Sequence, residues 1–220
     1  MREGQMTLEP WGSMLSAVTK PKLTYFDNPV SRGEECRLAF TVAGVDFEDN
    51  RLAPSAWASL KPDTPFGALP ILEVEGKPAV SQTNAILAYI GRKYDLLPRD
   101  EWESLRLQSL LEAAEELRHT ISKTFGIKDA AELERRRSEL VEGPIRSWGA
   151  HMEKQIVGPF AAGEQIGVAD IKLFVVLGWL KKGALDHIPT DVLDHLPKLQ
   201  ALFENVKNHP RVVAWYARAL

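Results

Sequence analysis

The order of strand-like and helix-like patterns in the first 94 residues constrains the fold more than any other feature. Residues 22–26 are a short run of leucine, threonine and aromatic residues that ends in an Asp-Asn-Pro turn, which is typical of a strand entering a loop. From Gly33 to Gly44 the apolar residues follow a helical spacing, and residues 45–52 predict a second strand. Residues 71–80 predict a hairpin around a Glu-Gly turn, and an amphipathic helix then continues to about Tyr94. The chain therefore begins with a βαβ unit that is followed by a ββα unit.

This order of elements is that of the thioredoxin fold, so we expect a thioredoxin-like α/β domain over residues 21–95. Between its second and third strands, the segment Trp57–Lys61 is expected to add one or two helical turns. Residues 1–20 carry no clear periodicity, and they are interpreted as a weakly ordered extension in front of this domain.

Only helical patterns follow a linker at residues 95–100, so residues 101–220 predict an all-helical domain of about five helices. A leucine stripe marks the first of them, and the strongly charged segment 130–153 predicts the second. A very apolar segment begins with Gly167 as N-cap and Asp170 as an acid in the third helical position, which predicts a buried central helix. The remaining helices are expected in the C-terminal tail.

Charge and composition argue against several classes of function. The formal net charge of -3 provides no basic field, so neither a nucleic acid nor an anionic membrane is expected as a partner. No apolar run approaches the roughly 20 residues that cross a bilayer. Cys36 is the only cysteine, which excludes an intrachain disulfide and favours a reducing, cytoplasmic location. The five histidines have no ligand spacing, so no metal site is expected.

Several short motifs occur in an order and spacing that resemble the cytosolic glutathione transferases, closest to the sigma-like class. They are Leu23-Thr24-Tyr25-Phe26, Ser31-Arg32-Gly33-Glu34, Trp57, Lys61, the run Pro65 to Leu72, and Ser81-Gln82-Thr83. A single one of these motifs is common by chance, so the resemblance rests on the order and spacing of all of them together. It runs from about Pro21 to the C-terminus and implies a thioredoxin-like N-terminal domain that binds glutathione, plus an all-α C-terminal domain that forms the electrophile pocket.

The resemblance implies that Tyr25, at the end of the first strand, donates a hydrogen bond to the sulfur of glutathione. A thiol with a pKa near 8.5 is mostly protonated at neutral pH, whereas the thiolate is the nucleophile. One charge-assisted hydrogen bond, worth about 1.5 to 3 kcal/mol, lowers such a pKa by about one to two units. Ser31 is the alternative activating residue, because other classes of the family use a serine in this loop. Cys36 falls inside the first helix and is interpreted as a small packed side chain.

The resemblance also implies a set of glutathione-binding residues: Arg32, Trp57, Lys61, Ala68, Leu69, Pro70, Gln82 and Thr83. A cis peptide bond before Pro70 would turn the backbone of Leu69 toward the ligand, where a peptide can pair as it does at a sheet edge. Gln82 and Thr83 stand at a helix start, where free N–H groups favour the carboxylate of the γ-glutamyl end. The two cations and the tryptophan of the set are expected near the glycine end and the sulfur.

The favoured function is the conjugation of glutathione to small apolar electrophiles, as in detoxification. The electrophile is expected between the domains, against residues 107–125, where mostly apolar walls are predicted. A homodimer is implied by the resemblance, with Glu115 or Glu116 reaching the glutathione amino group of the neighbouring subunit. Isomerase, prostaglandin-synthase or peroxidase chemistry on the same thiolate stays open. So does a binding or structural protein of the same fold that has no catalytic activity.

Overall fold

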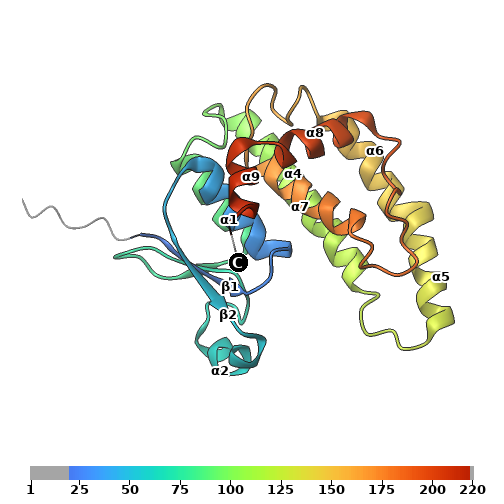
Figure 1. Cartoon of the computed structure of the whole chain (residues 1–220), viewed down its shortest axis with the longest axis horizontal. Helices are drawn as coiled ribbons and strands as arrows, with labels where there is room; N and C mark the ends of the chain where they lie inside the picture. Colours follow the sequence, from blue (N-terminus) through green and yellow to red (C-terminus); the bar gives the residue numbers. More distant parts are fainter. Residues whose placement is uncertain (1–19, 219–220) are drawn as a thin grey trace, which may run out of the picture.

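A four-stranded mixed sheet lies at one end of the described part of the chain, which covers residues 20–218 of the computed structural model (Figure 1). The strands have the order β2-β1-β3-β4. β1 (Lys22–Phe26) runs parallel to β2 (Glu48–Leu52) and antiparallel to β3 (Ile71–Glu73), which pairs with β4 (Val80–Ser81). This is the predicted βαβ-ββα order, and it confirms the thioredoxin-like fold. The predicted extension of residues 1–20 lies outside the described residues, apart from Lys20.

Helix α1 (Ser31–Ala43) ends as the sequence predicts, at Gly44 with a φ of 72°. The N–H of Val45 then donates to the carbonyl oxygen of Phe40 over 3.0 Å, which completes the C-terminal cap of the helix. Because Val45 belongs to this cap, β2 begins at Glu48, three residues after the predicted start.

Two more helical segments complete the sheet domain. The turns predicted around Trp57 are α2 (Trp57–Leu60), which lies between the 3-10 turns Pro54–Ala56 and Lys61–Asp63. After the hairpin, α3 (Thr83–Lys93) packs against α1 and α4.

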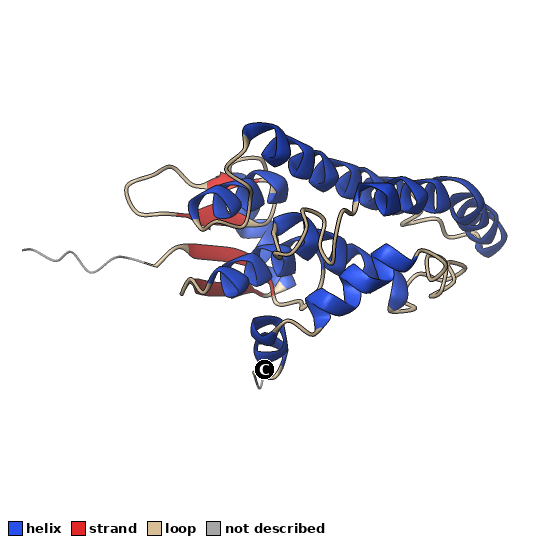
Figure 2. Cartoon of the chain, turned by 90° about the horizontal axis from the view of Figure 1, so that it is seen from above, coloured by secondary structure: helices blue, strands red, loops and turns tan. Residues whose placement is uncertain are grey.

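Six α-helices follow within the described residues, and Figure 2 shows the long ones extending away from the strands. They are α4 (Glu101–Ser122), α5 (Ala130–Leu140), α6 (Arg146–Gln155), α7 (Val168–Lys181), α8 (Pro197–Lys207) and α9 (Pro210–Tyr216). The expectation of five was wrong because the charged segment 130–153 is not one regular helix. A π-helical turn, Val141–Ile145, interrupts it and contains Pro144, which has no N–H to donate to a regular helix.

Helix α7 is the predicted central helix, and its side chains are buried along most of its length. The Asp170 carboxylate accepts hydrogen bonds from the backbone N–H of Gly167 at 2.8 Å and of Ala161 at 2.7 Å. Burial raises the pKa of Asp170 to about 6, although these two donors act in the opposite direction. α7 packs against α1, α4 and α8, so one hydrophobic core joins the sheet domain to the helices. None of the helices within residues 20–218 is both long enough and apolar enough to cross a membrane.

Candidate functional site

Tyr25 lies at the end of β1, and its ring packs against the first turn of α1. Only 8% of the residue is exposed. A Cβ atom on Gly33 would lie 2.1 Å from the Tyr25 ring, so only a glycine allows this approach. The Arg37 guanidinium lies 5.9 Å from the ring centroid. Tyr25 is therefore held in one place by the strand, the helix and a buried cation.

Arg37 also fixes the loop between β1 and α1. Its guanidinium is completely buried and donates hydrogen bonds to the carbonyl oxygens of Phe26 at 3.0 Å and Asn28 at 2.9 Å, and to the carboxylate of Asp49 at 2.8 Å. Sequence reasoning missed this residue, because an arginine in a helix is usually a surface charge. Its position among the small and apolar residues of α1 was the available signal.

Ser31 and Cys36, the two other residues of this region that were considered for a catalytic role, have different surroundings. Ser31 begins α1 with a φ of 70°, a conformation that serine rarely adopts. Cys36 is completely buried within the helix, and burial together with Glu35 raises the pKa of its thiol far above the ordinary value. Cys36 is thus a packed side chain, as the sequence predicts, and a thiolate is not favoured there.

The predicted glutathione-binding positions of the sheet meet at one edge. The register pairs Thr24 with Ile71 and Ile71 with Ser81, so the residues next to them come together at the same end of three adjacent strands. These neighbours are Tyr25, Pro70 and Gln82. The Leu69–Pro70 peptide bond is cis. We call Tyr25, Leu69, Pro70, Gln82 and Thr83 the sheet-edge site.

Buried polar atoms at the start of α3 mark one end of this site. The oxygens Ser81 Oγ, Thr83 Oγ1 and Asn84 Oδ1 are buried and have no hydrogen-bond partner within residues 20–218. Gln82, in front of the helix, has a φ of 78°. An unsatisfied buried polar group costs about 1 to 3 kcal/mol, so several together indicate the place of a polar ligand. The free N–H groups of the first helical turn would add to the binding of a carboxylate.

Trp57 and Lys61 lie beside the sheet-edge site. The Trp57 ring stands edge-on to Phe26 at 6.1 Å, which joins α2 to the end of β1. The Lys61 side chain is exposed and passes close to Gly67, where a Cβ atom would lie 3.3 Å from Lys61 Cε. Because Gly67 immediately precedes Ala68 and Leu69, the structure brings most of the predicted set into one region.

Arg32 has a different surrounding from the one predicted. Its guanidinium donates two hydrogen bonds to Glu115 Oε1 on α4, over 2.8 Å from Nε and 2.5 Å from Nη2. This ion pair links the sheet domain to the helices and is about one-third exposed. The structure thus places Arg32 against an acid of its own chain.

The Arg32 pair is the outer part of a larger group that we call the interdomain charge cluster: Arg32, Glu35, Glu115, Arg118 and Lys172. Lys172 Nζ on α7 lies 3.1 Å from Glu35 Oε2 and 2.8 Å from Glu115 Oε2. Arg118 Nη1 on α4 lies 2.6 Å from Glu35 Oε1. Lys172 and Glu35 are completely buried, and 4% of Arg118 is exposed.

The charge cluster fixes the ionisation of Glu115 and changes the expected lining of the electrophile pocket. Burial alone would raise the pKa of Glu115, but the cations Lys172, Arg32 and Arg118 lower it to about 2. Glu115 is therefore ionised at every physiological pH. The expectation of mostly apolar walls along residues 107–125 was incomplete, because this stretch of α4 also presents Glu115 and Arg118 to α1. Lys172, which interrupts an apolar run, was the only signal of the cluster in the sequence.

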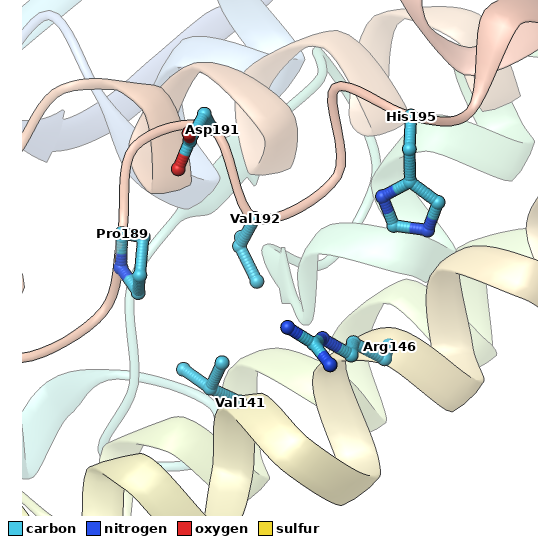
Figure 3. Close-up of a pocket in the computed structure, with 6 residues that line it drawn as sticks. All are labelled: Val141, Arg146, Pro189, Asp191, Val192 and His195. Atoms are coloured by element: carbon cyan, nitrogen blue, oxygen red, sulfur yellow. The ribbon is translucent and has the colours of Figure 1, made fainter.

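A separate hollow of about 410 Å³ lies far along the chain from these residues. Figure 3 shows Arg146 of α6 and Val192 facing into it, with His195 and Asp191 on the loop above. It contains none of the predicted site residues. Within residues 20–218, no group of three or more histidine, cysteine or acidic residues is placed to hold a metal ion.

Comparison with known proteins gives matches over both parts of the chain. The family model described as glutathione S-transferase, N-terminal domain, matches residues 21–92, and the one described as glutathione S-transferase, C-terminal domain, matches residues 115–219. Glutathione S-transferase 1 of Ascaris suum is 32% identical over 203 residues, which cover 89% of this chain and 95% of that protein. S-crystallin 4 of Enteroctopus dofleini is 26% identical over 207 residues, which cover 88% of this chain and 94% of that protein. The structure of prostaglandin synthase D of Nilaparvata lugens is similar, with a TM-score of 0.80 and 30% sequence identity; the match covers 91% of this chain and 99% of that one.

Proposed function

Because the chain belongs to the glutathione S-transferase family, we propose that it is an enzyme that conjugates glutathione to small electrophiles. One observation carries the proposal: Tyr25, Pro70 and Gln82 end adjacent strands at the same edge of the sheet. Two strand spacings separate Tyr25 from Gln82, about 10 Å, which is the length of an extended tripeptide. An extended glutathione molecule is therefore long enough to reach from Tyr25 to the unsatisfied oxygens at the start of α3.

The proposed reaction uses few groups of the protein. The Tyr25 hydroxyl donates a hydrogen bond to the glutathione sulfur, which favours loss of the thiol proton to solvent. The thiolate forms a bond to an electrophilic carbon, which either expels a leaving group with the electron pair or passes that pair to an atom that then takes up a proton. The remaining rate enhancement comes from holding the tripeptide in a fixed orientation along the strand ends.

The remaining binding residues keep their predicted roles in this proposal. Lys61 and Trp57 are expected at the sulfur and glycine end, and Leu69 and Ala68 along the peptide backbone. Arg32 would reach the ligand only if its pair with Glu115 reorients. The domains are proposed as residues 21–95 and 101–220.

We also propose a cytoplasmic homodimer in which an acid of α4 reaches the glutathione amino group of the neighbouring subunit. Glu115 is engaged by three cations of its own chain. Glu116 takes part in no ion pair among the residues that the structure describes, so it is the better candidate of the two. Exchange of Glu116 for glutamine should weaken glutathione binding without a change in the thiol pKa.

Two other functions use the same fold. The similarity to a structure named prostaglandin synthase D supports a glutathione-dependent isomerase, which needs the same thiolate and a different second pocket. The similarity to a protein named S-crystallin supports a structural or binding protein as the second alternative. The presence of Tyr25 favours the enzyme, because a protein that only binds glutathione needs no residue to ionise the thiol.

The test is the ultraviolet absorbance of the bound glutathione thiolate as a function of pH, in the parent and in Tyr25→Phe. We expect a thiol pKa depressed by about one to two units in the parent and restored in the variant. Ser31→Ala serves as the control and should leave the pKa depressed. Retention of glutathione with an ordinary thiol pKa would favour the binding protein, and a pKa restored only by Ser31→Ala would move the role to the serine.

A further inference from the structure

The interdomain charge cluster has more positive than negative charge. Its three most buried members are Lys172, Glu35 and Arg118, with two cations for one anion, and the partly exposed pair of Arg32 and Glu115 is neutral. The buried part therefore holds one uncompensated positive charge. Nη2 of Arg118 is buried without a hydrogen-bond acceptor within residues 20–218. An uncompensated charge is costly in such a place unless an anion comes close to it.

Tyr25 connects the predicted active site to the helix that carries part of the cluster. The Tyr25 ring touches Gly33, in the same turn of α1 from which Arg32 and Glu35 reach the cluster. Burial alone would lower the pKa of Arg118, but the carboxylates of Glu35 and Glu115 raise it. Tyr25 adds to this increase when it is ionised at high pH, so the two side chains are within electrostatic reach of each other.

The other charges around Tyr25 do not cancel this excess. Arg37, whose guanidinium lies 5.9 Å from the centre of the Tyr25 ring, forms a buried pair with Glu34 that has no net charge. Arg37 also contacts Asp49, which is bound to Arg51, and Arg51 in turn pairs with Asp27. These last three side chains are partly exposed, so water and salt screen them more than the buried cluster.

Two further titratable groups on or against α1 carry no charge at neutral pH. Burial raises the pKa of the Cys36 thiol, and Glu35 adds to the increase. Burial and Glu34 likewise raise the pKa of Tyr216 on α9. The excess positive charge of the cluster is thus the main buried charge that acts on the Tyr25 end of the site.

We propose that the interdomain charge cluster, through Arg118, is a second stabiliser of the glutathione thiolate beside Tyr25. The inference rests on the proposed function. Arg118 is a positioning residue here: it acts on the sulfur through the electric field of the buried cluster, while the Tyr25 hydroxyl donates the hydrogen bond. The thiolate supplies the negative charge that the cluster lacks.

The test changes the charge of the cluster in both directions and measures the pKa of bound glutathione by thiolate absorbance. Arg118→Met removes a positive charge and should raise the thiol pKa by about one unit. Glu35→Gln removes a negative charge and should lower it by a similar amount. The double variant, Arg118→Met with Glu35→Gln, restores one excess positive charge and should return the pKa to the parent value. A merely structural role of these residues would not move the pKa in opposite directions.

Arg118→Lys is the matched control, because it keeps the charge and should keep the parent pKa within a few tenths of a unit. If Glu35→Gln does not fold, the comparison of Arg118→Met with Arg118→Lys still decides the question. Equal thiol pKa values in these two folded variants would overturn the inference. Tyr25→Phe is measured in parallel: if it restores the pKa while the Arg118 variants do not move it, the proposed function stands and only the role of the cluster fails.

Discussion

The sheet-edge site and the interdomain charge cluster lie close together, and their buried oxygens differ in charge and in the cations that they contact. At the sheet edge, neutral oxygens of Ser81, Thr83 and Asn84 are buried without a hydrogen-bond partner in the described part of the chain. In the cluster, each carboxylate contacts two or more cations. Folding tolerates unsatisfied groups where a ligand is to satisfy them, whereas buried carboxylates are paired within the chain. Substitutions in the two regions should therefore affect stability and binding differently.

The largest effect is expected from Lys172→Met. The exchange removes the two charge-assisted hydrogen bonds that Lys172 donates to Glu35 and Glu115, at about 1.5 to 3 kcal/mol each, so the free energy of unfolding should fall by about 3 to 5 kcal/mol. Urea unfolding measures the change. Lys181→Met is the control on the same helix, because its pair with Asp194 is partly exposed and should contribute less than about 1 kcal/mol. Similar losses in both variants would mean that the buried pairs contribute no more than exposed ones.

Gly33→Ala tests the contact that positions Tyr25. The new Cβ atom would lie 2.1 Å from the Tyr25 ring, so strand and helix must separate, at a cost of about 3 kcal/mol. The thiol pKa of bound glutathione should rise as well, because the hydroxyl moves. Gly143→Ala is the matched control, since no atom lies within 4 Å of the added methyl group. It should leave stability within about 1 kcal/mol of the parent. An unchanged thiol pKa in a folded Gly33→Ala protein would show that Tyr25 does not need this packing.

The acid stability of the protein depends on Glu115. The pKa of Glu115 in the folded protein, about 2, is below its ordinary value of 4.5, so its contribution to stability is complete above pH 4.5 and is lost as the pH falls toward 2. We expect about 2 kcal/mol, after allowance for solvent screening on its partly exposed side. The difference in unfolding free energy between the parent and Glu115→Gln measures it. That difference should shrink between pH 4.5 and 2, and a difference that does not depend on pH would contradict the assignment.

Thr83→Val should give the smallest change in stability and the clearest contrast with the cluster. The exchange removes a buried hydroxyl that has no hydrogen-bond partner among the described residues, so the free energy of unfolding without ligand should rise by up to about 1 kcal/mol. Glutathione binding should weaken by about tenfold, which is about 1.4 kcal/mol. Calorimetric titration and urea unfolding give the two numbers. A loss of stability in the absence of ligand would show that the hydroxyl has a structural role and is not kept for binding.

The sequence alone predicted the elements whose signals are local. β1 has the predicted bounds, α1 ends at the predicted Gly44, and α7 begins at the predicted Gly167 cap. In each case a turn residue, a cap or a short-range spacing contains the whole signal, because it depends only on neighbours in the chain. The break of the segment 130–153 was missed, although Pro144 was visible in the sequence. A π-helical turn accommodates this proline, and its presence depends on packing.

The candidate site likewise contains residues that the sequence identified and residues that only the packing brought together. Tyr25, Pro70, Gln82 and Thr83 were identified because short motifs surround them, and their roles stay predictions that the experiments above test. The charge cluster could not be predicted, because its pairs connect Arg32 to Glu115 and Glu35 to Lys172 across 83 and 137 residues. In the sequence these are ordinary helix charges that water would solvate. Only the packing of α1, α4 and α7 removes that water and makes them one buried group, because the cost of an unpaired charge arises when the helices meet.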